Sequence, residues 1–150
     1  MEITLRSYTS SDFETLYEID QKCYERDLAY SKPELQSYLC LPGGDCVIAE
    51  IAGQIAGFLI TAHEDTFGDI VTIDVLESHR RHGVATRMLA EAERRLLAAG
   101  ATEIELETAT DNAAAIAFWQ KHGYRIRGTK KDYYPNGRDA WHMTKSLEEA

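Results

Sequence analysis

The stretch ESHRRHGVATRML (residues 77–89) places basic residues at the start of a predicted helix. A helix N-terminus presents unpaired backbone N–H groups and the positive end of the macrodipole, so acidic or hydroxyl residues usually occupy its first turn. Here Arg80, Arg81, His82 and Gly83 lead into the helix, and no acid follows until residue 91. Positive charge becomes favourable there once an anion binds, so the stretch predicts an anion site. A solvated basic loop is the alternative.

The type of anion is narrowed by the glycine pattern. A strand, a short glycine-containing loop and a helix N-terminus together direct several backbone N–H groups at one point. The chain has no GxxxxGK[ST] loop for a nucleoside triphosphate and no GxGxxG loop for a dinucleotide. The pattern that remains is Arg80-x-x-Gly83-x-Ala85, in which Gly83 lets the backbone approach the anion closely.

Composition limits the partners. With 150 residues, 44% hydrophobic and 27% charged, we expect a single domain over residues 1–150. The net charge of −9 argues against nucleic acid and anionic membranes as partners. No signal peptide or apolar span is visible, and the three cysteines lack CxxC spacing, so we expect a cytoplasmic protein with reduced thiols. The histidines show neither HxH nor HExxH spacing, and no metal is expected.

The elements that must position these residues follow from hydrophobic periodicity and from turn and capping signals. Ser11 with Glu14 predicts a capping box, and Asn112 predicts a helix cap. We expect strands at 2–8, 46–51, 54–62, 69–76, 103–108, 124–134 and 140–147, and helices at 11–23, 33–39, 83–99 and 112–123. The order β-α-α-β-β-β-α-β-α-β-β predicts an α/β (α+β) fold with a mixed sheet of about seven strands and about four helices on both its faces.

At Arg80-x-x-Gly83-x-Ala85 the sequence resembles the GNAT acetyltransferase superfamily. The segment LETATDNAAAIAFWQKHGY resembles the second motif of that superfamily, an acid followed five residues later by Asn and then an alanine-rich helix. The tail KKDYYPNGRDAWHMTKSL resembles the RimI-like branch, which acetylates protein N-terminal α-amines. The resemblance covers essentially the whole chain and implies a GNAT-type, mostly antiparallel sheet.

Acetyl-CoA is the co-substrate that the resemblance implies. Its pyrophosphate would lie on the backbone amides at the start of the 83–99 helix, its pantetheine arm would pair with the preceding strand, and the N–H of Val75 would polarise the thioester carbonyl. Asn112 matches a cofactor contact, with a helix cap alone as the alternative. The implied cofactor-binding residues are Ile73, Asp74, Val75, Arg80, Arg81, His82, Gly83, Val84, Ala85, Thr86 and Asn112.

The resemblance implies that Glu107 is the general base, acting through water. Alternation also places Glu103, Glu105 and Glu107 on one face of a strand, so a solvated acidic face is the alternative. Trp119 stands where close relatives have a general-acid tyrosine, and an indole donates a hydrogen bond but delivers no proton. Trp119 therefore lines the site or fills the core. Water, Tyr124 and Tyr133 are the candidate proton donors, and departure of the thiolate without a donor is the alternative.

The expected acceptor is the α-amine of a protein or peptide, a ribosomal protein among the candidates, bound by a monomer or homodimer. Tyr30, Tyr133 and Tyr134 stand where the resemblance places substrate-binding residues. Acidic residues between 20 and 39 resemble a substrate-facing rim: Asp20, Glu25, Asp27 and Glu34. A small-molecule amine acetyltransferase and a CoA-binding module without turnover are the alternatives.

Overall fold

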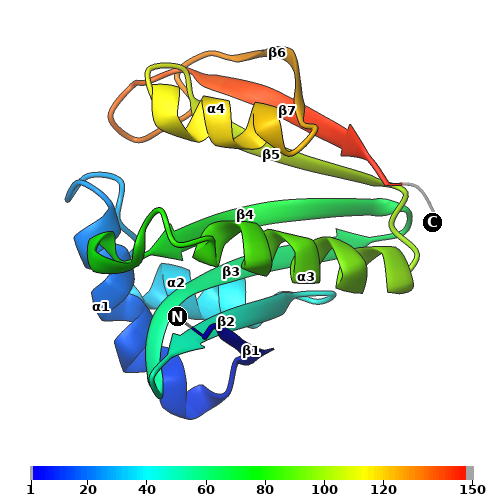
Figure 1. Ribbon diagram of the computed structural model, residues 1–150. Helices are drawn as coiled ribbons and strands as arrows, with labels where there is room; N and C mark the ends of the chain where they lie inside the picture. Colours follow the sequence, from blue (N-terminus) through cyan, green and yellow to red (C-terminus); the bar gives the residue numbers. More distant parts are fainter. Residues whose placement is uncertain (1, 148–150) are drawn as a thin grey trace.

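The computed structural model describes residues 2–147 (Figure 1). Its elements in chain order are β1 (Thr4–Ser7), the short 3-10 helix η1 (Ser10–Asp12), α1 (Phe13–Cys23), α2 (Lys32–Leu39), β2 (Asp45–Ile51), β3 (Gln54–Glu64), β4 (Phe67–Val75), the 3-10 helix η2 (Glu77–His79), α3 (Val84–Ala98), β5 (Glu103–Ala109), α4 (Ala113–Lys121), β6 (Arg125–Lys130) and β7 (Ala140–Ser146). These elements follow the predicted order.

The described strands form one seven-stranded sheet in the order β1-β2-β3-β4-β5-β7-β6. Only β4 and β5 pair in parallel, and α3 makes the crossover between them. All other neighbours pair antiparallel. The predicted mixed, mostly antiparallel sheet flanked by four helices is confirmed.

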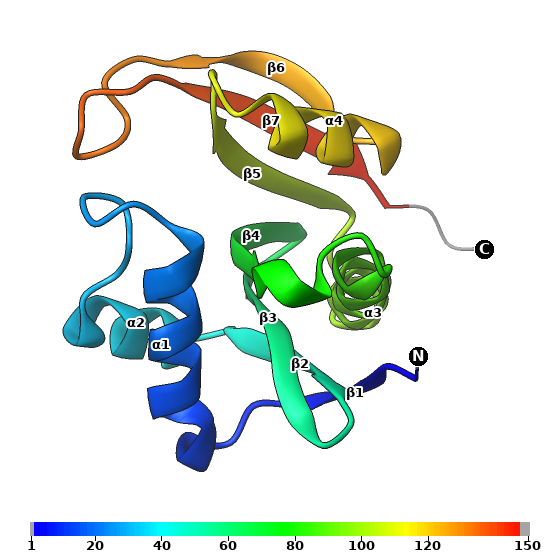
Figure 2. The ribbon, with the colours of Figure 1, turned by 60° about the vertical axis from the view of Figure 1, so that its left-hand side comes forward.

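Helices cover both faces of the sheet (Figure 2). Along β3, side chains alternate between the faces because successive residues of a strand point in opposite directions. Leu59 belongs to the core cluster that holds Met88 of α3, whereas Phe58 belongs to the cluster that holds Leu16 of α1 and Leu35 of α2. The sheet therefore separates an α3/α4 side from an α1/α2 side.

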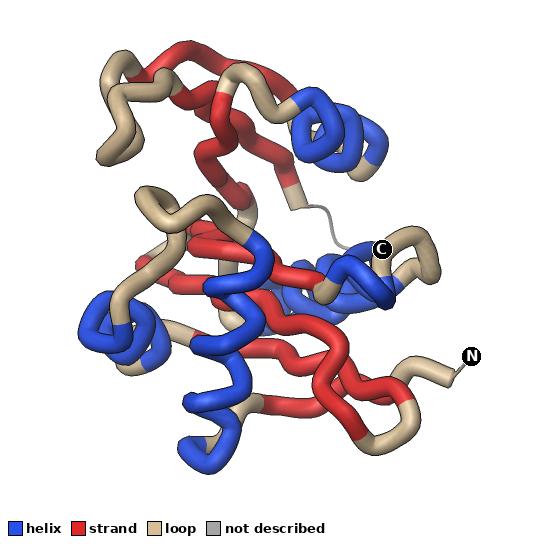
Figure 3. The backbone as a smooth tube through the Cα atoms, turned by 90° about the vertical axis from the view of Figure 1, so that its left-hand side faces the viewer, coloured by secondary structure: helices blue, strands red, loops and turns tan. Residues whose placement is uncertain are grey.

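Strands β4 and β5 pair only at their beginnings. The parallel pairing runs from Phe67 with Glu103 to Asp69 with Glu105 and stops there. A bulge in the β3–β4 register follows directly, with Val71 as the extra residue. Beyond it the two strands diverge (Figures 1 and 3). We call this divergence of β4 and β5 the splay. It leaves the edge of β4 beyond the bulge without a partner among the described strands, in the middle of the sheet.

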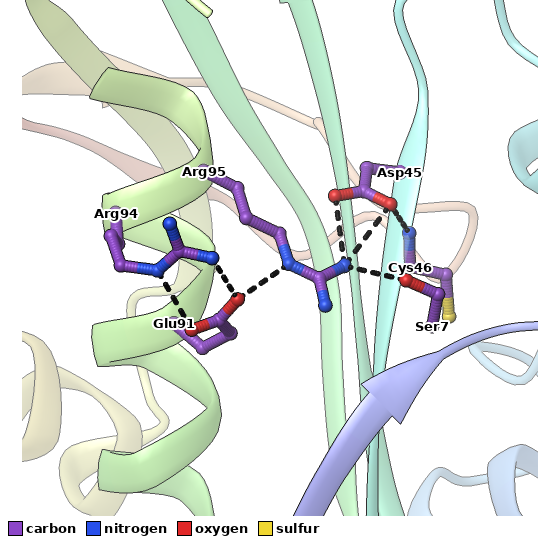
Figure 4. Close-up of polar contacts among 6 residues, drawn as sticks. All are labelled: Ser7, Asp45, Cys46, Glu91, Arg94 and Arg95. Carbon is purple, nitrogen blue, oxygen red and sulfur yellow. Dashed lines mark hydrogen bonds and ion pairs between the residues drawn. The ribbon is translucent and has the colours of Figure 1, made fainter. Parts of the chain in front are cut away.

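Arg95 ties α3 to the first two strands (Figure 4). Its Nε donates to Glu91 one turn earlier in α3 at 2.7 Å. One terminal nitrogen donates to Ser7 Oγ at 3.1 Å and to Asp45 Oδ2 at 3.2 Å. This network holds the C-terminal part of α3 against β1 and β2.

Two local predictions are wrong. The capping box at the first helix is formed by Thr9 and Asp12, whose carboxylate accepts from the Thr9 N–H at 2.8 Å, and not by residues 11 and 14. The predicted strand 124–134 ends at Lys130, because positive φ at Asp132 turns the chain away from the sheet. Within residues 2–147, no helix is long and apolar enough to cross a membrane.

Candidate active site

The edge of β4 at the splay carries the backbone groups of Ile73 and Val75. The Leu76 N–H donates to the Ala56 carbonyl of β3 at 2.9 Å, and backbone groups alternate in direction along a strand. Asp74 therefore turns its backbone to β3, while Ile73 and Val75 turn theirs to the splay. Of the three strand residues predicted to bind the cofactor, Ile73 and Val75 therefore present backbone groups at this edge, whereas those of Asp74 face β3. Cofactor binding by this segment stays a prediction.

Side chains from outside the sheet meet these two carbonyls. The Tyr24 hydroxyl donates to the Ile73 carbonyl at 3.2 Å. Arg80 Nε donates to the Val75 carbonyl at 3.0 Å, and the Cys23 thiol approaches the same oxygen at 3.4 Å. Arg80 thus reaches back to the strand end and places positive charge beside the splay.

The first turn of α3 is built for an anion. Arg81 and Gly83 both have positive φ, 66° and 82°, which turns successive N–H groups toward one point. The α3 N-cap makes no side-chain hydrogen bond, and the first turn holds no acid. A Cβ added at Gly83 would meet open space, so the front of the helix is unobstructed. The residues present therefore fit a phosphate group.

The α4 helix approaches this turn at one end. His122 Nε2 lies 3.2 Å from Thr86 Oγ1 in the first turn of α3. Asn112 caps α4, as predicted, by accepting from the Ala115 N–H at 3.1 Å. The capping function of Asn112 is observed, and its contact with a cofactor stays a prediction.

Glu107 lies at the centre of a polar cluster on the α1/α2 side of the sheet. Lys130 Nζ donates to its Oε2 at 3.0 Å, and His142 Nδ1 lies 2.8 Å from the same oxygen. The Tyr133 hydroxyl donates to Oε1 at 3.3 Å. Burial raises the pKa of Glu107, but the hydrogen bonds from His142 and Lys130 outweigh it, so its pKa is lowered. Glu107 is an ionised, well-held carboxylate.

Asp69 adds negative charge next to this cluster. Burial, followed by the charges of Glu107 and Glu105, raises the pKa of Asp69 to about 6. Asp69 is paired with Glu105 in the β4–β5 register, at the last pair before the splay. The floor of the site is therefore acidic, which suits a cationic amine.

Trp119 lies in the core on the α3/α4 side and is only 5% exposed. Its ring packs edge-on against Phe118 and Tyr124, with centroids 5.0 and 5.3 Å away. The Tyr124 hydroxyl donates to Glu93 Oε2 of α3 at 2.7 Å, and burial raises the pKa of Tyr124. Trp119 and Tyr124 are packed core aromatics, which leaves Tyr133 as the tyrosine in contact with Glu107.

Tyr30 lies in the α1–α2 connection and packs on Tyr38 with ring centroids 5.0 Å apart. Its backbone N–H donates to Asp20 Oδ2 at 2.7 Å. Asp20 is fully buried, so its assignment to an acidic rim is wrong: the carboxylate anchors the loop from inside. Burial raises the pKa of Tyr30, and its hydroxyl stays neutral.

Tyr133 and Tyr134 lie in the β6–β7 connection, with rings edge-on at 4.9 Å. The sequence places both at the end of the predicted strand 124–134. The loop instead brings both rings together, and burial raises the pKa of Tyr134 to about 12. Arg138 of the same loop donates to Glu25 of the α1–α2 connection at 3.3 Å, so the two loops meet over the splay.

Comparison with known proteins agrees with this geometry. Residues 13–124 match the model of the Acetyltransferase (GNAT) family. The chain belongs to the GNAT acetyltransferase family. An uncharacterized N-acetyltransferase of Methanocaldococcus jannaschii is 26% identical over 97% of this chain and 93% of its own length. An N-alpha-acetyltransferase of Sulfurisphaera tokodaii is 29% identical over 67% of this chain and 68% of its own.

The fold of a GNAT enzyme is seen equally in a solved structure. The ribosomal-protein-S18-alanine N-acetyltransferase of Escherichia coli superposes with a TM-score of 0.89 at 24% identity, covering 99% of this chain and 96% of that one. As a member of the GNAT family, the chain is an N-acetyltransferase that depends on acetyl-CoA. The described part of the chain holds no group of three or more His, Cys, Asp or Glu side chains placed to bind a metal ion.

Some residues of this GNAT site escaped sequence reasoning. Tyr24 reaches the Ile73 carbonyl from a loop, and no motif marks it. His142 meets Glu107 because β5 and β7 pair in a register that places the two opposite each other. The alternation of β7 around the buried Met143 could have assigned the face of His142, but its partner strand could not be read from the sequence.

Proposed function

We propose that this enzyme transfers the acetyl group of acetyl-CoA to the N-terminal α-amine of a protein or peptide. The observation that carries the proposal is the state of Glu107, a carboxylate held ionised by Lys130 and His142. Since its pKa is lowered, Glu107 is a weak base. A weak base suits an acceptor that is already partly neutral.

The choice of acceptor follows from the energy needed to deprotonate it. A lysine side chain, with an ordinary pKa of about 10.4, costs about 4.6 kcal/mol to neutralise at pH 7. An α-amine, with a pKa of about 7.7 to 8.0, costs only about 1.4 kcal/mol or less. Glu107, acting through water, would therefore be sufficient for an N-terminus and poor for lysine.

Acetyl-CoA supplies an activated acetyl group when bound. The amides of residues 81–86 would hold its pyrophosphate, with Arg80 and Arg81 adding positive charge. The splayed edge of β4, at Ile73 and Val75, would align the pantetheine arm as an added strand. The Val75 N–H would then face the thioester oxygen and favour the negative charge that develops there.

The tyrosines around the acceptor site favour a peptide as the acceptor. Tyr30, Tyr133 and Tyr134 come from two loops that Arg138 and Glu25 join over the splay. Their neutral hydroxyls would hydrogen-bond the first peptide unit, and their rings would exclude water from the thioester. The name of the Sulfurisphaera tokodaii relative, an N-alpha-acetyltransferase, supports the same acceptor class.

One observation favours a second candidate, a small cationic amine such as a polyamine. Asp69, Glu105 and Glu107 form an acidic floor that would attract several positive charges at once. A CoA-binding module without turnover is disfavoured, since Glu107 and Tyr133 are hydrogen-bonded at the site.

The test is CoA release measured with peptide N-termini, lysine peptides, polyamines and aminoglycosides as acceptors. We expect peptides with a free α-amine to have the highest kcat/KM. Glu107→Gln should lower kcat at least about 100-fold and leave acetyl-CoA affinity unchanged. Glu103→Gln, on the same strand face, is the control and should keep wild-type turnover. A polyamine that outperforms every peptide would overturn the acceptor class.

A further inference from the structure

His142 and Glu107 stand directly opposite each other in the β5–β7 pairing. Their side chains lie on the same face, with Nδ1 of the imidazole 2.8 Å from Glu107 Oε2. The other ring nitrogen, Nε2, lies 3.7 Å from Glu105 Oε2, two residues earlier on β5. The imidazole therefore bridges two carboxylates. Packing does not require histidine here, because a β-branched residue would fill a strand position as well.

Glu107, His142 and Glu105 form a row of side chains along which exposure increases steadily. Glu107 is 13% exposed, His142 25% and Glu105 42%. The row therefore runs from the interior of the site to solvent. Imidazole accepts a proton at one nitrogen while releasing one from the other, so it can connect a buried base to water.

The chemistry requires such a connection. When an ammonium group becomes an amide, nitrogen loses two protons as the N–C bond forms and the C–S bond breaks. Sulfur takes the bonding electron pair and one proton, so one proton per turnover must reach solvent. Glu107 holds a proton poorly because its pKa is lowered, so that proton must move on.

We propose that His142 is a positioning residue that acts through Glu107 and relays the acceptor's proton from Glu107 to solvent beside Glu105. When Glu107 is protonated, the relay uses the tautomer of His142 that carries its proton on Nε2: Nδ1 takes the proton from Glu107, and Nε2 releases its own proton to Glu105 or water. The ring is left as the Nδ1–H donor to ionised Glu107, and exchange of the ring proton with solvent restores the first tautomer. This inference rests on the role proposed above for Glu107. The ionisable groups around His142 come from four neighbouring segments. They are Glu105 and Glu107 of β5, Asp69 of β4, Lys130 of β6 and Tyr133 of the β6–β7 connection.

The experiment compares His142→Ala and His142→Gln with the control Thr144→Val, which lies two residues along the same strand and opposite Glu105. Turnover is measured from pH 5.5 to 9 with saturating acetyl-CoA and the best acceptor of the panel. We expect His142→Ala to lower kcat about tenfold or more and to change the pH profile of kcat. Acetyl-CoA affinity, measured by calorimetry, should stay unchanged.

Rescue separates a relay from a structural contact. Free imidazole in the buffer should restore turnover to His142→Ala, since it can occupy the vacated position and carry protons. His142→Gln can still donate a hydrogen bond to Glu107 but relays nothing, so it should stay slow. Wild-type rates in His142→Ala, full activity in His142→Gln, no rescue by imidazole, or an equal loss in Thr144→Val would each overturn the proposal.

The acceptor class is tested separately. If the wild-type enzyme prefers a small amine over peptides, the proposed substrate fails, and the His142 variants are compared on that amine with the same expected results. If Glu107→Gln keeps full turnover while His142→Ala loses it, the role of Glu107 fails and the relay from it is overturned as well.

Discussion

Asp20 of α1 and Asp74 of β4 are buried neighbours in the interior of the protein, and the proximity of Asp20 raises the pKa of Asp74. Both are essentially unexposed, at 0% and 1%. Within the described residues, Asp20 Oδ1 and Asp74 Oδ2 have no hydrogen-bond partner, and a proton shared between the two carboxyl groups would satisfy both atoms. Thr72 donates to Asp74 Oδ1 at 3.0 Å, and the Tyr30 N–H donates to Asp20 Oδ2 at 2.7 Å. The pair thus links the acceptor-side loop to the strand that carries Ile73 and Val75.

This pair makes stability depend on pH. Burial, and then the proximity of the Asp20 carboxyl group, raises the pKa of Asp74 well above its ordinary value. The raised pKa of Asp74 adds to the free energy of unfolding. This contribution is complete below the pKa of an aspartate in the unfolded chain, about 3.9, and is lost as pH rises through the pKa of Asp74 in the folded protein. Asp74→Asn keeps the hydrogen bonds but cannot ionise, so we expect its stability relative to wild type to increase from pH 5 to pH 8.

Urea denaturation of both proteins across this range measures the effect. Asp74→Leu is the comparison: it leaves Asp20 without a partner and should be less stable than wild type at every pH, because an uncompensated buried carboxyl remains. If the free energies of unfolding of Asp74→Asn and wild type differ by the same amount from pH 5 to pH 8, Asp20 and Asp74 share no proton.

Gly83 can be separated from the other glycines with positive φ. Gly83→Ala places a Cβ at φ 82° and should destabilise the fold by about 1 kcal/mol. Gly53→Ala, in the β2–β3 turn at φ 78° with equally open space, should cost a similar amount. Only Gly83→Ala should also weaken CoA binding, by about tenfold or more, since its Cβ would enter the space in front of α3. If calorimetry gives Gly83→Ala the same affinity for CoA as wild type and Gly53→Ala, the phosphate site at the start of α3 is refuted.

Arg95 and its neighbour Arg94 offer a matched test of how α3 is held (Figure 4). Both contact Glu91, whose pKa their hydrogen bonds lower to about 2. Only Arg95 also reaches Asp45 and Ser7 on the sheet. Arg95→Met should therefore lower the free energy of unfolding by about 1 to 2 kcal/mol, and Arg94→Met should leave it unchanged. Denaturation midpoints that move equally would contradict the anchoring role.

Local sequence signals predicted the helices, the strands and the anion site, whereas the acidic cluster depends on the register in which the strands pair. Gly83 and Asn112 indicate helix starts in the sequence, and they are the N-caps of α3 and α4. The resemblance places Asp20 in an exposed acidic rim, yet Asp20 is buried beside Asp74, which lies 54 residues away on another element. Burial of a charged residue is set by such distant pairing, which no local pattern contains.

The same reason explains Tyr133 and His142. Their side chains meet on one carboxylate only because β5 pairs with β7 and the β6–β7 loop folds back over that pair. In the sequence Tyr133 and Tyr134 end a segment that is predicted to be a strand, and the turn at Asp132 removes them from it. Sequence reasoning could therefore name Glu107 but could not name the groups that set its pKa.

The most direct test of the proposed activity uses one peptide that carries both a free α-amine and an internal lysine. The peptide is incubated with the enzyme and acetyl-CoA, and fragment mass spectra locate the added acetyl group. We expect acetylation at the α-amine, with no product when that amine is blocked beforehand. Acetyl groups on the lysine at an equal or higher rate, or equal turnover of the blocked peptide, would show that the α-amine is not the preferred acceptor.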